Sequence, residues 1–274
     1  MIVVQNLAKK QYFTEIFQKF AKGLAKLIST DDEWAVKGFI DVFGNIYTIS
    51  QDTKVISKIL ELQLFPFLLS FADEHNYEIE VATHQNWYPD LTFINKTDRR
   101  IKFAVDIKTT YRLENNPEFC NGFTLGSHGE YFINRNSTKN IQYPYKEYCG
   151  HFCLGIIYSR AELEKIYQLS KYNINQLKDI PSVINTFTFF AEEKWKIASD
   201  KCGSGNTANI GSIKRIDDIL NGRGVFLKYG EHIFDDYWVN YGKIQIPTGG
   251  GGYKPMRSFA DYLSYKGLPE DFND

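Results

Sequence analysis

The sequence predicts a single α/β domain of the α+β kind, with a mixed central β-sheet flanked by helices. Two local patterns carry this prediction. Residues 101–108 alternate apolar and polar side chains as a strand does, and apolar residues recur at three- and four-residue spacing over residues 5–29, as on one face of a helix. The 274 residues, 43% hydrophobic and 24% charged, are enough for a full core. Because no internal repeat or compositional shift marks a linker, we expect one domain over residues 1–274.

The first expected element is the amphipathic helix over residues 5–29. Its apolar stripe consists of Phe13, Phe17, Phe20, Leu24 and Leu27. Several aromatic side chains on one exposed helix would form a surface for a partner, so this helix is our candidate for dimerisation.

The next elements are a hairpin and a second helix. Residues 39–49 are predicted to pair as two strands because apolar runs flank Gly44 and Asn45, a frequent turn dipeptide. Asp52 is expected to cap a helix whose apolar residues are Val55, Ile56, Ile59, Leu60 and Leu62. Pro66 is expected to kink or end that helix, because proline cannot donate the helical hydrogen bond.

A second hairpin follows, with strands over residues 91–94 and 101–108 and a polar turn over 95–98. Alternation along the second strand puts Asp106 and Lys108 on one face. A hairpin centred on Asp98 brings Asp90 opposite Asp106, with Cβ atoms about 5 Å apart. Two carboxylates this close repel each other unless a cation lies between them.

This spacing suits phosphodiester hydrolysis. Two acids can hold a divalent cation against a phosphodiester, and a nearby lysine can help to aim a water at it. The pattern alone is weak, because a Pro-Asp pair with a following acid-x-Lys occurs by chance in about one chain in ten of this length. The alternative is an ordinary hairpin with surface charges.

Weaker patterns describe the second half of the chain. Residues 115–129 are expected to be rich in loops, residues 152–158 to form a buried strand or a core helix, and residues 161–171 to be helical. Residues 187–190 and 195–198 are expected to be strands. Loops are expected at residues 203–207 and at the four glycines 249–252, the latter within a variable tail over 241–274.

Charge and cysteine content restrict the environment. The net charge of -1 argues against a nonspecific nucleic-acid coat but permits a basic cleft. We expect neither a signal peptide nor a membrane span, because residues 1–4 are too short an apolar run and polar residues and Pro66 interrupt residues 62–71. Cys120, Cys149, Cys153 and Cys202 fit neither a disulfide framework nor a zinc pattern, which indicates the reducing cytoplasm.

Two further motifs are ambiguous by themselves. Gly203-x-Gly205-x-x-Ala208 superficially matches a dinucleotide fingerprint, but no apolar helix follows it. A plain surface turn is one alternative. A base-reading loop is the other, since Asn206 could pair with adenine and the Thr207 methyl could contact thymine. Glu61 alone is an ordinary solvent-facing residue of the helix that Asp52 caps.

Several stretches in the same order resemble the EcoRV family of type II restriction endonucleases. They cover most of residues 37–240 and are the segments 52–55, 85–90, 106–111, 137–141, 171–175 and 203–213. The resemblance implies a restriction-endonuclease-like core of the PD-(D/E)xK superfamily. It also implies a homodimeric, Mg²⁺-dependent enzyme that cuts double-stranded DNA within GATATC, with blunt ends, a 5′-phosphate and a 3′-hydroxyl.

The resemblance also implies a role for individual residues. Asp90 and Asp106 would be metal ligands, Lys108 the catalytic lysine, and Glu61 an auxiliary catalytic acid at the metal. Residues that would contact or support DNA are the major-groove loop Gly203, Ser204, Gly205, Asn206 and Thr207, the minor-groove residues Gln85 and Asn86, and the backbone contacts Thr109, Thr110, Lys139 and Asn209.

The chain departs from the family pattern in places, and other functions remain open. Trp87 stands where the family has His, the N-terminal helix is longer, residues 113–129 carry extra length, and the tail around 249–252 differs. These departures affect expected tail–phosphate contacts and details of the dimer surface. The alternatives are another PD-(D/E)xK nuclease, for repair or junction resolution, and a non-catalytic DNA-binding module. An intact Asp90–Asp106–Lys108 set argues against the second.

Overall fold

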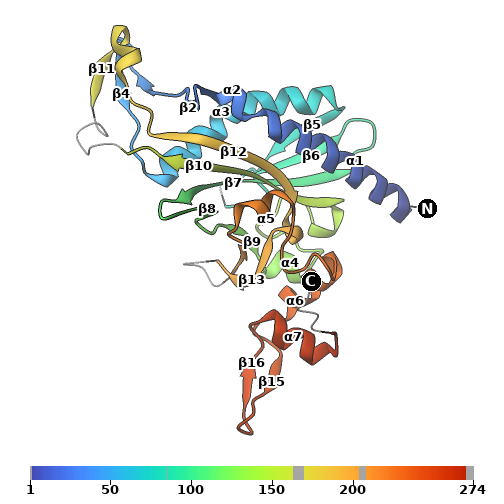
Figure 1. Ribbon diagram of the computed structural model, residues 1–274. Coiled ribbons are helices and arrows are strands. Elements are labelled where there is room, and N and C mark those ends of the chain that lie inside the picture. Colours follow the sequence, from blue (N-terminus) through green and yellow to red (C-terminus); the bar gives the residue numbers. More distant parts are fainter. Residues whose placement is uncertain (1, 85, 163–169, 204–207, 270–274) are drawn as a thin grey trace.

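A mixed eight-stranded sheet forms the centre of the computed structural model, which describes residues 2–84, 86–162, 170–203 and 208–269 (Figure 1). Its strands follow the order β1-β2-β12-β10-β7-β6-β5, and β8 pairs with β7. Strands β7 and β10 are parallel, and the other neighbours are antiparallel. The bounds are β1 Ser29–Thr30, β2 Glu33–Trp34, β5 Tyr77–Val81, β6 Leu91–Asn95, β7 Lys102–Leu113, β8 Asn116–Cys120, β10 Gly150–Arg160 and β12 Ile184–Glu193. The predicted mixed sheet is confirmed.

Three smaller sheets and the helices complete the described part of the chain. The smaller sheets join β3 Gly38–Ile40, β4 Asn45–Thr48 and β11 Lys171–Asn173; β9 Thr124–Ser127, β13 Ala198–Cys202 and β14 Asn209–Ser212; and β15 Gln245–Pro247 with β16 Tyr253–Pro255. The α-helices are α1 Ile2–Gly23, α2 Ala25–Ile28, α3 Thr53–Glu74, α4 Glu130–Ile133, α5 Ile216–Leu220, α6 Glu231–Asn240 and α7 Phe259–Lys266. The 3-10 helices are η1 Tyr145–Glu147, η3 Ile174–Asp179 and η4 Lys194–Lys196.

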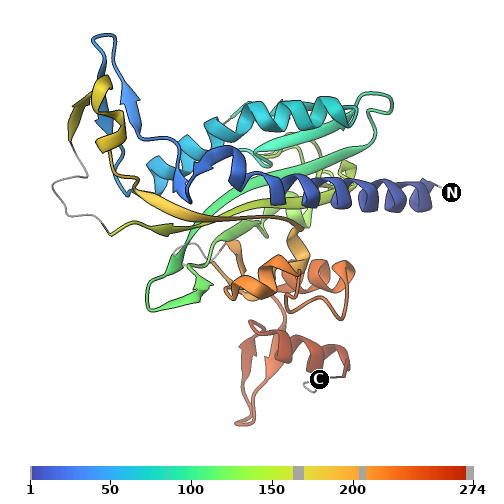
Figure 2. The ribbon, with the colours of Figure 1, turned by 45° about the horizontal axis from the view of Figure 1, so that its top comes forward.

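Helices α1 and α3 lie along one face of the central sheet (Figure 2). The aromatic stripe of α1 is buried there, with the Phe13 ring stacked on Phe103 at 4.1 Å between centroids and Phe17 packed on Phe71 of α3. Phe13 and Phe17 are fully buried in this chain. The predicted exposure of these aromatic side chains is therefore wrong, because they pack into the core of this chain, although Leu27 of the stripe is 52% exposed. Dimerisation through residues 5–29 stays a prediction.

Helix α3 begins where the sequence predicts. The Asp52 side chain accepts hydrogen bonds from the backbone N–H groups of Lys54 and Val55, which caps the helix. The helix does not end at Pro66, because Leu64 and Leu68 on either side are buried in the core and hold it in place. By length and composition, α3 could cross a membrane, although no such segment was expected from the sequence. Its buried side chains belong to the core of this chain.

Both predicted hairpins form. In the first, β3 and β4 pair around Gly44, whose φ of +77° suits glycine. In the second, β6 and β7 pair with Leu91 opposite Val105 and Phe93 opposite Phe103, which is the predicted register. Strand β7 is longer than predicted, because it continues past the hairpin beside β10.

The opposite face of the sheet carries the C-terminal half of the chain (Figure 1). The buried segment 152–158 lies in strand β10, and residues 187–190 lie in strand β12. The expectation of loops over 115–129 is wrong, because β8 pairs with β7 and β9 pairs with β14. The expected strand over 195–198 is also wrong, because the chain turns through η4 before β13 begins.

The remaining expectations concern loops. The four glycines 249–252 form the turn between β15 and β16, where the Thr248 N–H donates to the Gly252 carbonyl at 2.8 Å. Most of the predicted helix over 161–171 lies outside the described residues, as do residues 204–207 and 270–274 and the single positions 1 and 85.

Candidate active site

The backbone of the β6–β7 hairpin brings Asp90, Asp106 and Lys108 together. The Asp90 N–H donates to Asp106 Oδ1 at 3.2 Å, and the Ile107 N–H donates to Asp90 Oδ2 at 2.8 Å. Lys108 Nζ lies 3.3 Å from Asp106 Oδ2 and 3.5 Å from Asp90 Oδ2. The three predicted side chains therefore converge, and Lys108 contacts both carboxylates.

The two carboxylates differ in their surroundings. Burial acts to raise the pKa of Asp106, but the Lys108 and Lys194 ammonium groups outweigh it and hold that pKa well below its ordinary value. Burial and the neighbouring Asp106 charge raise the pKa of Asp90. The site thus contains one firmly ionised carboxylate and, beside it, a second one whose negative charge a cation would stabilise.

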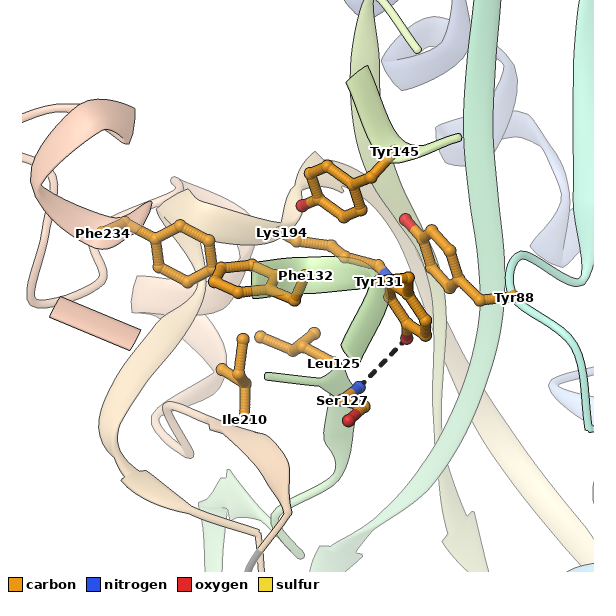
Figure 3. A pocket seen from close by; sticks show the side chains of 9 residues that line it. All are labelled: Tyr88, Leu125, Ser127, Tyr131, Phe132, Tyr145, Lys194, Ile210 and Phe234. Atoms are coloured by element: carbon orange, nitrogen blue, oxygen red, sulfur yellow. Dashed lines mark hydrogen bonds between the residues drawn. The ribbon is translucent and has the colours of Figure 1, made fainter. Parts of the chain in front are cut away.

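Sequence reasoning missed Lys194. Its Nζ lies 2.7 Å from Asp106 Oδ2, and its charge lies over the Tyr88 ring at 4.0 Å from the centroid. Figure 3 shows Lys194 running past Phe132 toward Tyr88 and Tyr131. The cavity beside it has a volume of about 10 Å³, which leaves room for one water at most. Lys194 lies 88 residues from Asp106 in sequence, so only the folded sheet brings the pair together.

Aromatic side chains, among them Tyr88 and Tyr145, line the cavity beside Lys194, and a buried histidine contacts both of these tyrosines. The Tyr88 hydroxyl is hydrogen-bonded to His151 Nδ1 at 2.7 Å, and the His151 ring stacks on Tyr145. Burial, followed by the charges of Lys194 and Arg135, holds the pKa of His151 well below its ordinary value. Because the imidazole is neutral, it does not compete with Lys194 for Asp106.

Two hollows meet at Asp90. One, of about 320 Å³, is lined by Asp90, Asp106 and Lys108. The other, of about 900 Å³, lies between the N-terminal half of α3, the end of β5 and the middle of β7, and is lined by Asp90 and Glu61 among others. Glu61 is paired with Lys58 at 2.7 Å. Glu61 therefore shares a hollow with one aspartate and does not line the hollow of Asp106 and Lys108.

Most of the predicted DNA-contacting residues that the structure describes line these hollows. Asn86, Lys139 and Asn209 line the hollow of Asp106, and Lys139 is paired there with Glu130 at 2.8 Å. Thr109 lines the hollow of Glu61. Thr110 does not fit a direct contact with DNA, because it is buried and its hydroxyl donates to the Asn121 carbonyl within the chain.

Of the predicted base-reading loop, only Gly203 belongs to the described residues, and Gln85 lies outside them too. The Gly203 N–H donates to the Asn209 carbonyl at 2.9 Å, where β13 and β14 pair. A Cβ atom at Gly203 would lie 2.4 Å from the Thr124 methyl group, so a side chain here would require Thr124 to move. Asn209 pairs with Ser127 of β9, and both line the hollow of Asp106. The described ends of this loop, Gly203 and Asn209, are therefore connected through β14 and β9 to the hollow that contains Asp106.

The donor set fits a magnesium ion. Carboxylate oxygens are hard ligands, and Mg²⁺ is usually held by one or two carboxylates together with waters and substrate phosphate. Among the described residues no third His, Cys, Asp or Glu completes a three-ligand cluster with the aspartates. Asp90 uses only Oδ2 in its contacts with Ile107 and Lys108, so Oδ1 is available to a cation.

Comparison with known proteins agrees with this geometry. The sequence matches the family model described as restriction endonuclease EcoRV over residues 30–267. It is 41% identical over 216 residues to the type II restriction enzyme EcoRV of Escherichia coli, with 78% of this chain and 85% of that enzyme covered. The chain belongs to the EcoRV restriction endonuclease family.

EcoRV family membership makes this protein a type II restriction endonuclease. The matched range includes Glu61, Asp90, Asp106, Lys108 and Lys194, and it excludes α1. Among solved structures, the NlaIV restriction endonuclease has a TM-score of 0.41 at 12% identity, with 94% of this chain and 92% of that chain covered.

Proposed function

We propose that this EcoRV-family enzyme hydrolyses duplex DNA within GATATC in a Mg²⁺-dependent reaction. The products are blunt ends with a 5′-phosphate and a 3′-hydroxyl. The observation that carries the proposal is the convergence of Asp90, Asp106 and Lys108 at the edge of one hollow, in a chain of this family. Cleavage takes place in the cytoplasm, in keeping with the four free thiols.

Asp90 and Asp106 hold the metal, and Lys108 acts on the phosphate. The ion, when bound, lowers the pKa of a water and neutralises charge on the phosphate. Burial acts to lower the pKa of Lys108, but Asp106 and Asp90 outweigh it and the net pKa is raised. Lys108 is therefore a cation, able to donate to a phosphate oxygen as negative charge grows in the transition state. Glu61 acts as an auxiliary acid from the adjoining hollow.

Sequence is read by the loop Gly203, Ser204, Gly205, Asn206 and Thr207. Asn206 has the donor and acceptor that match adenine, and the Thr207 methyl suits thymine. A bidentate contact discriminates by about 1–3 kcal/mol, so Asn206→Ala should relax or abolish the site preference. Gln85 and Asn86 act near the minor groove, while Lys139, Asn209 and Thr109 contact the DNA backbone.

A second copy of this chain completes the enzyme, because a palindromic site is matched by a two-fold axis. The surface that supports this is the small sheet of β3, β4 and β11 with η3, which projects from the central sheet (Figure 1). Its exposed large apolar residues are Phe39, Ile40, Val42, Phe43, Tyr47, Ile174 and Leu177. Val42 is 93% exposed and Phe43 82%, an exposure that a second copy would remove.

Sedimentation tests the dimer. The double substitution Val42→Asp and Phe43→Asp should give a monomer, while Leu7→Asp on the exposed side of α1 should leave the dimer intact. A dimer that survives in the first variant and dissociates in the second would move the interface back to the N-terminal helix.

Digestion of plasmids tests the reaction. Plasmids carrying GATATC, GATATC methylated at N6 of the first adenine, or no such site are incubated with Mg²⁺ or EDTA, and the ends are sequenced. Only the unmethylated site should be cut. The cut should leave blunt ends and should occur with Mg²⁺ and not with EDTA. Cleavage at an unrelated sequence would overturn the specificity, and structure-dependent nicking would favour a repair or junction-resolving nuclease.

A further inference from the structure

We propose that Lys194 is a positioning residue that balances the charge of Asp106, so that Lys108 is free to leave the carboxylates and engage the DNA. The proposal rests on the function above and assigns a role to a second lysine in the same site. Two ammonium groups contact the same oxygen, Asp106 Oδ2, at unequal distances: Lys194 Nζ at 2.7 Å and Lys108 Nζ at 3.3 Å.

Lys194 cannot reach the substrate itself. Its side chain is 6% exposed, and that of Asp106 is 5% exposed. The Tyr88 ring closes one side of the ammonium group, and Gly126 closes another. A Cβ atom at Gly126 would lie 3.4 Å from Lys194 Nζ, an ordinary van der Waals contact, so this backbone lies close beside the ammonium group. Lys194 therefore acts through Asp106 alone.

Lys108 is held less tightly and faces the open hollow. Its side chain is 23% exposed, and its contacts with Asp106 and Asp90 are 3.3 Å and 3.5 Å long. It also lines the hollow of about 320 Å³ together with the two aspartates. Of the two lysines, only Lys108 can turn toward a phosphate in that hollow.

The pairing with Lys194 makes that movement possible. A buried carboxylate left without any cation is strongly unfavourable. If Lys108 were the only ammonium group on Asp106 Oδ2, its departure would leave that buried oxygen without a partner, even with a metal ion on the other oxygen. Because Lys194 stays bonded to Oδ2, Asp106 remains paired when Lys108 moves away.

Unfolding of the DNA-free protein tests the pairing. Urea unfolding without metal is measured for wild type, Lys194→Met, Asp106→Asn and the double variant. Lys194→Met alone should lower the urea midpoint, and the same substitution in the Asp106→Asn background should lower it much less or raise it. Equal losses in both backgrounds would overturn the pairing.

A matched control and a fallback keep this test decisive. Lys196 lies two residues away and pairs with Glu192 and Glu193 instead, so Lys196→Met should be additive with Asp106→Asn. If Lys194→Met alone does not fold, the double variant, which removes both charges, should still fold. A double variant that also fails to fold would count against the proposal.

Metal binding and turnover test the role of Lys194 in releasing Lys108. Mg²⁺ is titrated into the DNA-free protein by calorimetry, and cleavage is followed at saturating DNA and Mg²⁺. In Lys194→Met the loss of a cation beside Asp106 should tighten Mg²⁺ binding by about tenfold. The kcat should fall by about a hundredfold, because Lys108 is then held at Asp106, as expected for losing one transition-state donor. Lys194→Arg should recover part of the rate.

The outcomes separate this proposal from the proposed function. Weaker Mg²⁺ binding together with a lower kcat would mean that Lys194 only maintains the shape of the site, and would overturn its role. If the wild-type protein does not cleave DNA at all, the proposed function fails, while the unfolding cycle still decides whether Lys194 and Asp106 are paired.

Discussion

The two faces of the central sheet differ in the side chains that they bury, although the same strands form both faces. Under α1 and α3, β7 presents Phe103 and Val105 to an aromatic core around Phe13. On the other face the same strand presents Asp106, which is buried with Lys194. Both faces bury apolar side chains, but the second face also keeps a carboxylate and an ammonium group out of water, which costs stability.

The largest expected effect lies on the apolar face. Phe13 is fully buried among the rings of Phe103, Phe152 and Phe17. Phe13→Ala should lower the free energy of unfolding by about 3–5 kcal/mol, while the folded fraction cleaves at the normal rate. Chemical denaturation measures the loss. Tyr12→Ala, on the exposed side of α1, is the control, and a comparable loss there would contradict the division between the faces.

Lys108→Ala should have the largest effect on the reactive face. Cleavage at saturating Mg²⁺ should fall by about 10²–10³-fold, as when one transition-state donor is removed. The fold should survive, because Asp106 keeps its ion pair with Lys194. Asp90→Ala and Asp106→Ala should also lose cleavage. Rapid-quench measurement decides this, and wild-type rates in Asp106→Ala would refute the metal-ligand assignment.

Lys10 links the two faces and gives a dependence on pH. It pairs with Glu193 of β12 and with Glu231 of α6 at 2.7 Å. Burial acts to lower the pKa of Lys10, but Glu231 and Glu193 outweigh it, so the net pKa is raised above 10.5. The stability that Lys10 contributes is therefore fully present below pH 10.5 and is lost as the pH rises through the folded-state pKa.

Lys10→Met should lower the free energy of unfolding by about 1.5–3 kcal/mol near neutral pH, the range for a hydrogen bond to a charged group. The difference from wild type should shrink above pH 10.5. Denaturation curves at several pH values measure it, with the exposed Lys9→Met as control. A difference that stayed constant into the alkaline range would show that the charge of Lys10 is not responsible.

The smallest of these effects is expected at Glu61, which lies in the adjoining hollow. Glu61→Ala should slow cleavage by about tenfold, below the range of about 10²–10⁴-fold for a direct acid–base group, because Glu61 does not line the hollow of Asp106 and Lys108. Its helix is held by the Asp52 cap and buried leucines, so stability should hardly change. Single-turnover cleavage rates of Glu61→Ala and of Lys58→Met, which removes the partner of Glu61, are compared to test this. A loss of rate in Glu61→Ala as large as that in Lys108→Ala would make Glu61 a principal metal ligand.

Local patterns predicted the elements whose partners are near in sequence. The register of β6 and β7 followed from alternation and a short turn, and it brought Asp90 to Asp106. Lys194 could not be found this way, because it reaches Asp106 through the pairing of β7, β10 and β12, three strands far apart in sequence. For the same reason the aromatic stripe of α1 was assigned to a partner, although Phe103 and Phe152 of this chain cover it.

Strands β8 and β9 were missed because their pairing residues are not alternating. Strand β8 contains Pro117 and two exposed polar neighbours, and it pairs with β7. Strand β9 pairs with β14, which lies more than 80 residues further along the chain. Thr110 was predicted to contact or support the DNA because its sequence context matched, but its side chain is buried in the protein, which is compatible only with the supporting role. Burial depends on the fold and not on the motif.

The two-sided use of strand β7 does not allow residues to be inserted into it. Even-numbered Asp106 and Lys108 line one hollow, while odd-numbered Ile107 and Thr109 line the other. A one-residue insertion before Asp106 within the strand would move every later side chain to the opposite face of the sheet. A two-residue insertion would shift Asp106 by about 7 Å from Asp90. The exposed turn residues Lys96, Thr97 and Arg99 lie outside this constraint. Variation in length is therefore confined to the turn, and the strand can change only by substitution.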